Sequence, residues 1–284
     1  MQKFEKFSIN IGGKLHFIER PWVMGILNVT PDSFYAGSRC QSDEASARRA
    51  EQMVAEGAEI IDVGGYSSRP GADDVTPEEE FRRLSQGIEA VRKAAGDEYP
   101  ISIDTFRASV ARRCIDKYGA LIINDISGGT LDEQMFSTVA ELKVPYILMH
   151  MRGTPSTMQS LTKYDNLLAD IIADLAFKAS TLTQMGVSDI IIDPGFGFSK
   201  DVEQNYELMA HLDEVHALGL PILVGISRKS MIYKPLGITP ADALAGTIAL
   251  NTAAIMAGAH IIRVHDVASA VQARDVATFI TNAY

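Results

Sequence analysis

The sequence predicts an α/β fold, a single (β/α)8 TIM barrel preceded by a short N-terminal β-hairpin, and three observations support this fold class. Eight short apolar runs rich in β-branched residues recur along the 284 residues, and each is followed by a longer stretch with helical period. The runs lack polar alternation, which is typical of parallel strands covered on both faces. Eight such units in about 260 residues match the usual size of one closed barrel.

A doubly wound open sheet is the alternative fold for strands that alternate with helices. Such a sheet usually has fewer strands, and its first strand is followed by a glycine-rich turn. Here the first turn reads Asn-Val-Thr-Pro-Asp-Ser at residues 28–33 and contains no GxGxxG motif. The sequence therefore favours the barrel over a dinucleotide-binding fold.

The predicted elements follow in chain order. The hairpin spans residues 6–18, is split by Gly12-Gly13, and should cap the N-terminal mouth of the barrel; residues 1–20 form this extension and residues 21–284 the barrel. The predicted strands are residues 23–29, 60–63, 101–104, 121–125, 146–150, 190–193, 222–226 and 261–265. The predicted helices are residues 44–56, 77–95, 108–118, 132–142, 167–185, 203–218, 241–257 and 268–280.

Two helix starts are marked by residue type. Thr76-Pro77, followed by three glutamates, supplies an N-cap, a proline at the first helical position and acids that favour the helix dipole. Thr239-Pro240, followed by Ala241-Asp242, repeats this pattern. We therefore expect helices to begin at both places.

Charge and cysteine content exclude several classes of protein. The 26 Lys and Arg against 36 Asp and Glu give a net charge of −10, which disfavours a nucleic-acid or anionic-membrane partner because such proteins carry basic faces. Cys40 and Cys114 cannot build a disulfide framework, and Cys114 should lie on a buried helix face. The N-terminus lacks a signal-peptide pattern, and no run of 18 apolar residues occurs. We expect a cytoplasmic protein.

Polar residues stand at the ends of the predicted strands, where barrel enzymes place their chemistry. Helix caps and Asx turns explain any one such residue, but a polar site explains all of them together. In chain order they are Asn28, Asp62, Asp104, Asn124, His150, Asp193, Ser227 and the pair Arg263 and His265.

Three of these residues suggest the kind of ligand. Asp104, Asn124 and Asp193 can point at one flat heterocycle with adjacent N–H donors and a carbonyl, such as a 2-amino-4-oxo pyrimidine ring, because carboxylates accept and a carboxamide does both. A carboxylate metal site is the alternative. We rank it lower, since no close His ligands and no HExxH motif accompany the acids.

Cations follow the last two strands, at the usual phosphate site of this fold. Ser227-Arg228-Lys229-Ser230 follows the seventh strand, and Arg263-Val264-His265 ends the eighth. A solvated Arg-Lys pair on a surface loop is the alternative for residues 228–229. Residues 30–42 and 64–76 form long loops of the kind that serve as lids, and residues 153–159 form a similarly exposed loop. A disordered surface connection is the alternative for each of the three.

Together these segments resemble the dihydropteroate synthases, a family of pterin-binding barrels. The matching segments span the eight predicted strands: residues 24–34 (MGILNVTPDSF), 67–71 (SSRPG), 103–105 (IDT), 123–126 (INDI), 193–198 (DPGFGF), 227–230 (SRKS) and 262–265 (IRVH). The first and the last two are specific to the synthases, whereas the Asp and Asn positions are shared across pterin-binding barrels.

The resemblance implies an activity, a cofactor and partners. The reaction would condense 6-hydroxymethyl-7,8-dihydropterin diphosphate with p-aminobenzoate to give 7,8-dihydropteroate and diphosphate in folate synthesis, with Mg²⁺ as cofactor. Sulfonamides would compete at the p-aminobenzoate site. The family also suggests a homodimer, for which the apolar helix 241–257 could supply an interface, although packing of that helix against the barrel is the more economical explanation.

The resemblance also implies a role for individual residues. The catalytic group would be Asn28, Asp104, Lys229, Arg263 and His265. The pterin would contact Asp104, Asn124, Ile126, Met149, Asp193, Phe198, Gly225, Lys229 and Arg263. The diphosphate would contact Asn28, Ser68, Arg263 and His265, with Asn28 also binding the metal. The p-aminobenzoate would contact Phe34, Ser68, Arg69, Pro70 and Ser230.

Two loops depart from the family pattern. Many members have Phe-Ser-Asp-Gly where this chain has Phe-Tyr-Ala-Gly at residues 34–37, so no role of that acid can be transferred. The common Glu-Ser-Thr-Arg-Pro becomes Tyr-Ser-Ser-Arg-Pro at residues 66–70, and Ser68 keeps a hydroxyl there.

The expected mechanism is a dissociative substitution. Arg263, His265 and Mg²⁺ on Asn28 would stabilise departing diphosphate, the two aspartates would stabilise the electron-poor ring, and the neutral arylamine would then attack. Three other functions remain as alternatives: a methyltetrahydrofolate:corrinoid methyltransferase, a Schiff-base aldolase that uses Lys229, and a pterin-binding module without catalysis.

Overall fold

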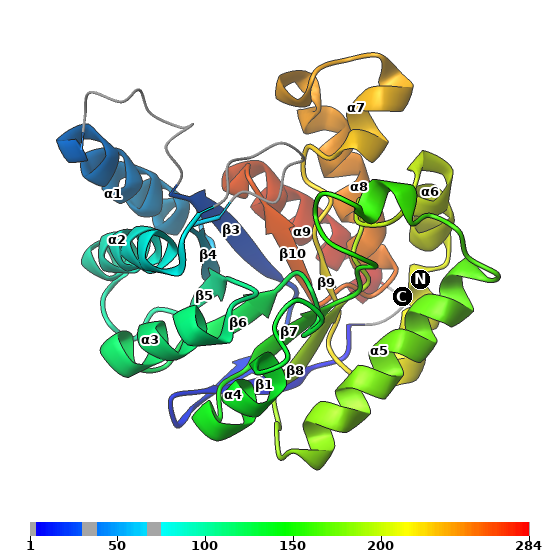
Figure 1. Cartoon of the computed structure of the whole chain (residues 1–284). Helices are drawn as coiled ribbons and strands as arrows, with labels where there is room; N and C mark the ends of the chain where they lie inside the picture. Colours follow the sequence, from blue (N-terminus) through cyan, green and yellow to red (C-terminus); the bar gives the residue numbers. More distant parts are fainter. Residues whose placement is uncertain (1–3, 30–38, 67–74, 284) are drawn as a thin grey trace.

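The computed structural model describes residues 4–29, 39–66 and 75–283, without the side chains of residues 39–43. Eight parallel strands form one sheet in the order β8-β7-β6-β5-β4-β3-β10-β9, and a parallel bridge between Ile192 and Ile222 joins its two ends. Helices surround these strands, as Figure 1 shows. The predicted (β/α)8 barrel is confirmed.

The barrel strands begin and end within one residue of their predicted bounds, apart from the seventh. They are β3 (Trp22–Asn28), β4 (Ile60–Gly64), β5 (Ile101–Asp104), β6 (Ile122–Asp125), β7 (Tyr146–Met149), β8 (Ile190–Asp193), β9 (Leu223–Val224) and β10 (Ile261–Val264). The seventh, β9, has only two residues where five were predicted.

The outer layer consists of helices. They are α1 (Arg39–Ala55), α2 (Pro77–Ala95), α3 (Ala108–Tyr118), α4 (Met135–Leu142), α5 (Leu167–Gln184), α6 (Val202–Ala210), α7 (Ser230–Leu236), α8 (Leu244–Met256) and α9 (Val267–Asn282), with short 3₁₀ turns at Met158–Ser160, Leu212–Leu218 and Pro240–Asp242. Helix α2 begins as predicted, because the Thr76 side chain accepts a hydrogen bond from the Glu79 backbone N–H. Cys114 is buried on α3, also as predicted.

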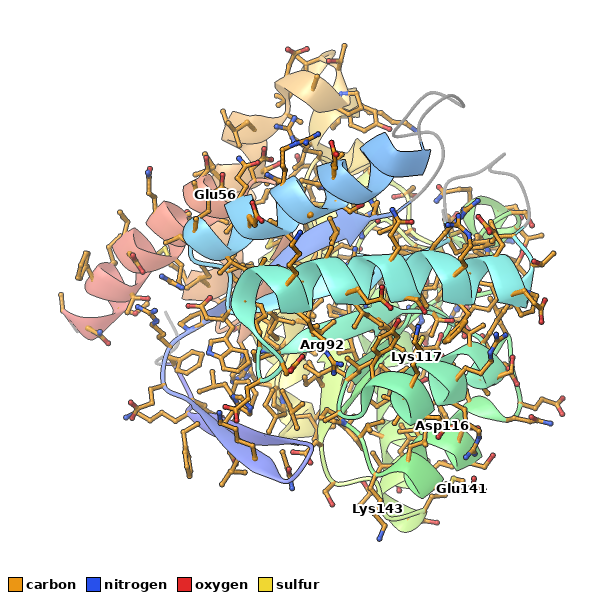
Figure 2. All side chains as sticks on the ribbon, turned by 90° about the vertical axis from the view of Figure 1, so that its left-hand side faces the viewer. Glu56, Arg92, Asp116, Lys117, Glu141 and Lys143 are labelled. Atoms are coloured by element: carbon orange, nitrogen blue, oxygen red, sulfur yellow. The ribbon has the colours of Figure 1, made fainter. Side chains whose placement is uncertain are left out.

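Charged side chains cover the outward side of this layer. Figure 2 shows Asp116, Lys117 and Glu141 on the outer side of α3 and α4. Lys117 pairs with Glu89 of α2 at 3.2 Å, and Arg112 of α3 pairs with Glu141 of α4. These pairs link neighbouring helices at the surface and lie far from the barrel interior.

Four predicted helices differ from the structure. The helix predicted over residues 44–56 begins earlier, at Arg39. The predicted helix 203–218 divides at His211 into α6 and a 3₁₀ turn. The predicted helix 241–257 begins only at Leu244, because Thr239 bonds the Asp242 side chain and the intervening residues form a 3₁₀ turn. The predicted helix 132–142 begins at Met135, since Asp132 instead accepts from the backbone N–H of Ala108, at the start of α3.

The N-terminal hairpin consists of β1 (Phe7–Ile11) and β2 (Lys14–Ile18), which pair antiparallel. Ile9, Ile11 and Ile18 are buried in one apolar cluster with inward-facing residues from seven barrel strands, among them Ile60 and Ile122. These barrel residues lie at or near the starts of their strands, so the hairpin covers the N-terminal mouth, as predicted.

The barrel interior changes from apolar to polar along the strands. Because side chains alternate between the two faces of a strand, residues two apart share the inner face. Ile60 belongs to the apolar floor, and Asp62 follows it two residues later on the same face; Ile122 and Asn124 repeat this step on β6, as do Ile191 and Asp193 on β8. The C-terminal half of the interior is therefore lined by polar side chains.

Candidate active site

The polar half of the barrel interior brings together five side chains from five strands. Asp62 lies on β4, Asp104 on β5, Asn124 on β6, Asp193 on β8 and Arg263 on β10. Neighbouring strands pair with Asp104 opposite Asn124 and Met149 opposite Asp193, so these residues stand at similar heights around the barrel. The side chains that the sequence placed at strand ends thus meet at the C-terminal mouth, where this fold carries its chemistry.

Arg263 joins two of the carboxylates. Its Nε donates to Asp62 Oδ2 at 2.6 Å, and its Nη2 donates to Asp104 Oδ2 at 2.9 Å. Burial acts to lower the pKa of Arg263, but Asp62 and Asp104 outweigh it and the pKa is raised. Burial raises the pKa of Asp104 to about 7 against the attraction of Arg263, with Asp62 adding repulsion. The guanidinium therefore stays charged, while Asp104 can change its protonation near neutral pH.

Asn124 has a fixed orientation. Its Nδ2 donates to Asp62 Oδ2 at 3.1 Å, and the side chain is buried. Since the amino end of the carboxamide is engaged by Asp62, the oxygen end faces the other way.

Asp193 and Lys229 lie close together beside Gly225. Asp193 Oδ1 accepts from the backbone N–H of Gly195 at 2.7 Å, and Lys229 Nζ donates to the carbonyl of Phe196 at 2.6 Å. A Cβ on Gly225 would stand 3.9 Å from both Asp193 Oδ2 and Lys229 Nζ, so this glycine leaves room between them. Burial raises the pKa of Asp193 and lowers that of Lys229 to about 8.

An apolar wall adjoins the polar half of the barrel interior. Ile126, Met149, Met151 and Met158 are buried together, and Phe198 packs against them. Lys229 Nζ lies 4.6 Å from the centre of the Phe198 ring. Met158 comes from the loop predicted to be exposed, so that part of the expectation is wrong: the loop sends one side chain into the cluster. The site therefore offers an apolar face beside hydrogen-bonding groups.

Asn28 and His265 stand at the rim of the site. Asn28 ends β3 and is exposed, and its Oδ1 lies 3.0 Å from where a Cβ of Gly64 would be. His265 follows β10, and its Nδ1 lies 3.0 Å from Ser227 Oγ. Ser227 also accepts from the backbone N–H of His265 at 3.2 Å, so this serine orients the histidine.

Arg228 is not available as a phosphate-binding cation. Its guanidinium forms two hydrogen bonds with the Asp266 carboxylate, at 2.8 and 2.9 Å, and it also donates to the carbonyls of Pro240 and Ala241. The cation expected from the Arg-Lys pair is thus Lys229 alone.

Four predicted site residues lie outside the described part of the chain: Phe34, Ser68, Arg69 and Pro70. The two loops predicted to be lids largely coincide with these gaps. Ser230 is described; it is the first residue of α7, directly after Lys229.

Sequence reasoning missed two functional candidates behind the site. Asp62 was noted as a strand end but not assigned a role, and the structure places it between Asn124 and Arg263. Lys200 is buried, and its Nζ donates to the carbonyls of Gly195 and Phe198 and lies 3.1 Å from His150 Nδ1. Burial lowers the pKa of Lys200 to about 7 and that of His150 to about 2. Through these bonds Lys200 stabilises the conformation of the loop that carries Phe198.

Metal ligands are sparse at this mouth. Within residues 4–29, 39–66 and 75–283, no group of three or more His, Cys, Asp or Glu side chains could hold a metal ion. Asn28 supplies one hard oxygen ligand. This donor set fits Mg²⁺, which commonly keeps several waters and is held by one or two protein groups together with substrate phosphates.

The bonds described above determine what the centre of the site can recognise. They engage Asp104 Oδ2, Asn124 Nδ2 and Asp193 Oδ1, and the remaining polar atom of each side chain is an oxygen. A ligand at this centre must therefore present several N–H donors, with a carbonyl for Lys229.

Known proteins agree with this chemistry: residues 24–265 match the family described as pterin binding enzyme. Fold and site thus define a pterin-binding barrel enzyme.

The individual relatives are more specific. The dihydropteroate synthase of Escherichia coli (strain K12) is 45% identical over 262 residues, which cover 91% of each chain. The Xanthomonas albilineans dihydropteroate synthase, solved with 4-aminobenzoic acid, has a TM-score of 0.88 and 36% identity and covers 97% of this chain and 98% of its own. The Yersinia pestis enzyme, solved with a sulfonamide drug, has a TM-score of 0.88 and 38% identity over 98% of this chain and 100% of its own. The chain belongs to the dihydropteroate synthase family, transferases of folate synthesis.

Proposed function

We propose that this site binds 6-hydroxymethyl-7,8-dihydropterin diphosphate and p-aminobenzoate and joins them into 7,8-dihydropteroate, releasing diphosphate. The single observation that supports this most is the set of three oxygens from Asp104, Asn124 and Asp193, opposed by the Lys229 ammonium. The 2-amino and ring N–H groups of a dihydropterin would donate to the oxygens, and its carbonyl would accept from Lys229. Ile126, Met149, Phe198 and Gly225 would line the faces of the ring.

The diphosphate would lie at the rim, between Asn28 and the Arg263–His265 end of β10. Ser68 would add a hydroxyl from its loop. Mg²⁺ on Asn28 would neutralise part of the charge that the diphosphate gains on leaving. Net charge does not oppose this assignment, because Mg²⁺ together with Arg69, Lys229 and Arg263 would make one mouth of an acidic barrel locally positive.

The substitution would proceed by loss of diphosphate before the amine attacks. Cationic charge that develops at the exocyclic methylene spreads into the pterin ring, where Asp104 and Asp193 would stabilise it. Arg263 and His265 would stabilise the departing oxygens. The amino group of p-aminobenzoate is neutral at pH 7, so its attack requires no strong general base.

The second substrate would bind on the outer side of the pterin. Phe34, Arg69 and Pro70, from the loops after β3 and β4, would frame it together with Ser230 at the start of α7 and Ser68. Arg69 would pair with the carboxylate of p-aminobenzoate. Sulfonamides, which share the aniline part of this substrate, would compete for the same place.

Release of diphosphate tests the proposal. The chain is mixed with the pterin diphosphate, with and without p-aminobenzoate and with and without Mg²⁺, and free diphosphate is measured by a coupled assay. We expect release that depends on both p-aminobenzoate and Mg²⁺. Binding of the pterin diphosphate without release would show a binding module without catalysis, and transfer of a methyl group to a corrinoid protein would show the methyltransferase alternative.

We further propose a homodimer in the cytoplasm. Neighbouring helices α8 and α9 both expose apolar residues, including Ala249, Ala253, Val276 and Phe279, which supports an interface there. The free, buried thiol of Cys114 suits a reducing compartment. No helix in the described ranges is long and apolar enough to cross a membrane.

A further inference from the structure

Asp62 lies in the barrel interior where a ligand cannot reach it. It is 0% exposed, and its strand neighbours in register are Ile26 of β3 and Ser102 of β5. Asp104 is the next inward-facing residue of β5 after Ser102, and it lies opposite Gly64 of β4. Asp62 therefore stands one layer beneath the side chains that face the ligand, and any effect on the reaction must pass through its neighbours.

One oxygen of Asp62 holds two of those side chains. Its Oδ2 accepts from Asn124 Nδ2 at 3.1 Å and from Arg263 Nε at 2.6 Å, although these residues come from β6 and β10. With Nη2 of Arg263 also bonded to Asp104, the plane of the guanidinium is fixed at two points. Asp62 thus determines the orientation of groups on two sides of the site.

A contribution to folding stability does not explain why an aspartate occupies position 62. Its Oδ1 is buried without a hydrogen-bond partner in the part of the chain that the structure describes, and so is Oγ of Ser102, its register neighbour. A buried carboxylate with an unsatisfied oxygen costs folding free energy that an apolar residue would not. A role in the site accounts for its presence.

We propose that Asp62 is a positioning residue that sets the specificity of the pterin site by fixing Asn124 as a hydrogen-bond acceptor. This rests on the proposed function. A free carboxamide can rotate to offer either its N–H₂ or its oxygen, and would accept a ring with a donor or a carbonyl at that position. By accepting from Nδ2, Asp62 holds the N–H₂ end toward itself and leaves the oxygen facing the ligand. The site therefore prefers a 2-amino ring over the analogue in which that amino group is replaced by a carbonyl oxygen.

The first test compares two ligands and three variants. Isothermal calorimetry measures dissociation constants of 6-hydroxymethylpterin and of its 2-oxo analogue. In Asp62→Ala, Asn124 is free to turn, so we expect the preference for the 2-amino ligand to fall by about 10²-fold. Asp62→Asn keeps an acceptor at the Oδ2 position and should retain most of the preference. Ser102→Ala, which changes the neighbouring buried polar group in the same layer, should leave it unchanged.

A double-mutant cycle separates positioning from a structural effect. If Asp62 acts through Asn124, the preference in Asn124→Ala should equal that in the double variant, because the second change has nothing left to orient. Thermal unfolding confirms that each variant folds; Asp62→Leu, which fills the space without an acceptor, replaces the alanine variant if that one does not fold.

Two results would overturn the proposal: an undiminished preference in Asp62→Ala or its leucine replacement, and additive effects in the cycle. Its failure is distinct from failure of the proposed function. An enzyme that releases no diphosphate with p-aminobenzoate contradicts the proposed function, whereas ligand preference is measured on the unphosphorylated ring and needs no turnover.

Discussion

At the scale of single residues, the pKa values of Asp104 and Lys229 predict a pH optimum. Burial raises the pKa of Asp104 to about 7 and lowers that of Lys229 to about 8. As pH falls through about 7, Asp104 takes up a proton and loses an acceptor; as pH rises through about 8, Lys229 loses its charge. Because kcat/KM reports the free enzyme, its profile for the pterin diphosphate should be bell-shaped with a maximum between these values.

Lys229→Arg is the matched variant for the alkaline side. Arginine remains charged at every pH of the assay, so the decline near pH 8 should move to higher pH while the acid side stays in place. Ionisation of the substrate itself affects both pH profiles equally, so a difference between the profiles reports the change at Lys229. A decline near pH 8 that is identical in both enzymes would show that Lys229 does not cause it.

Single residues also show how much of the site could be predicted from the sequence. Asp104, Asn124, Asp193 and Arg263 were located because the last inward position of a barrel strand is fixed by alternation along the strand. Lys200 could not be found this way, since it lies seven residues after Asp193 in a loop whose path depends on tertiary contacts. At Gly195 of that loop, φ is +75° and a Cβ would come 2.0 Å from the His150 carbonyl oxygen.

At the scale of elements, apolar runs rich in β-branched residues, each followed by a stretch with helical period, located every barrel strand. The misses occur where a local contact overrides the pattern. Helix α7 was not predicted; its seven residues include Pro235, a residue type that normally disfavours a helix. Helix α6 begins at a capping box formed by Asp201 and Gln204, yet its predicted continuation changes to a 3₁₀ turn after His211.

The hairpin is the element whose contribution to stability can be isolated. Ile18 is 0% exposed in the apolar floor, whereas its neighbour Phe17 is 73% exposed. Ile18→Ala should lower the free energy of unfolding by about 2–5 kcal/mol, and Phe17→Ala should change it by no more than about 0.5 kcal/mol. Urea unfolding measures both. Because the hairpin covers the mouth opposite the site, kcat/KM should be unchanged; equal effects of the two substitutions would contradict this role of the hairpin.

At the scale of the whole molecule, exposed apolar surface is the feature that a lone barrel does not account for. The α8 helix faces outward with Ala245, Ala249 and Ala253, and α9 exposes 54% of Val276 and 74% of Phe279. A stable dimer buries about 800 Å² on each partner, with aromatic residues at its centre. These helices supply the exposed aromatic ring and small residues that allow close approach, which the charged outer sides of α3 and α4 do not.

Charge placed in this surface should separate the two copies. Sedimentation velocity should give the native chain a mass near twice 30.9 kDa, and Phe279→Glu should sediment as a single chain because a buried unpaired carboxylate disfavours association. Phe177→Glu is the control: that ring lies on α5, is 75% exposed, and should leave the dimer intact. A native chain that sediments as a monomer would contradict the dimer. A dimer that only Phe177→Glu dissociates would place the interface elsewhere. Since the polar half of the barrel interior is complete within one chain, dissociation should leave pterin binding unchanged, so assembly and ligand recognition can be measured independently.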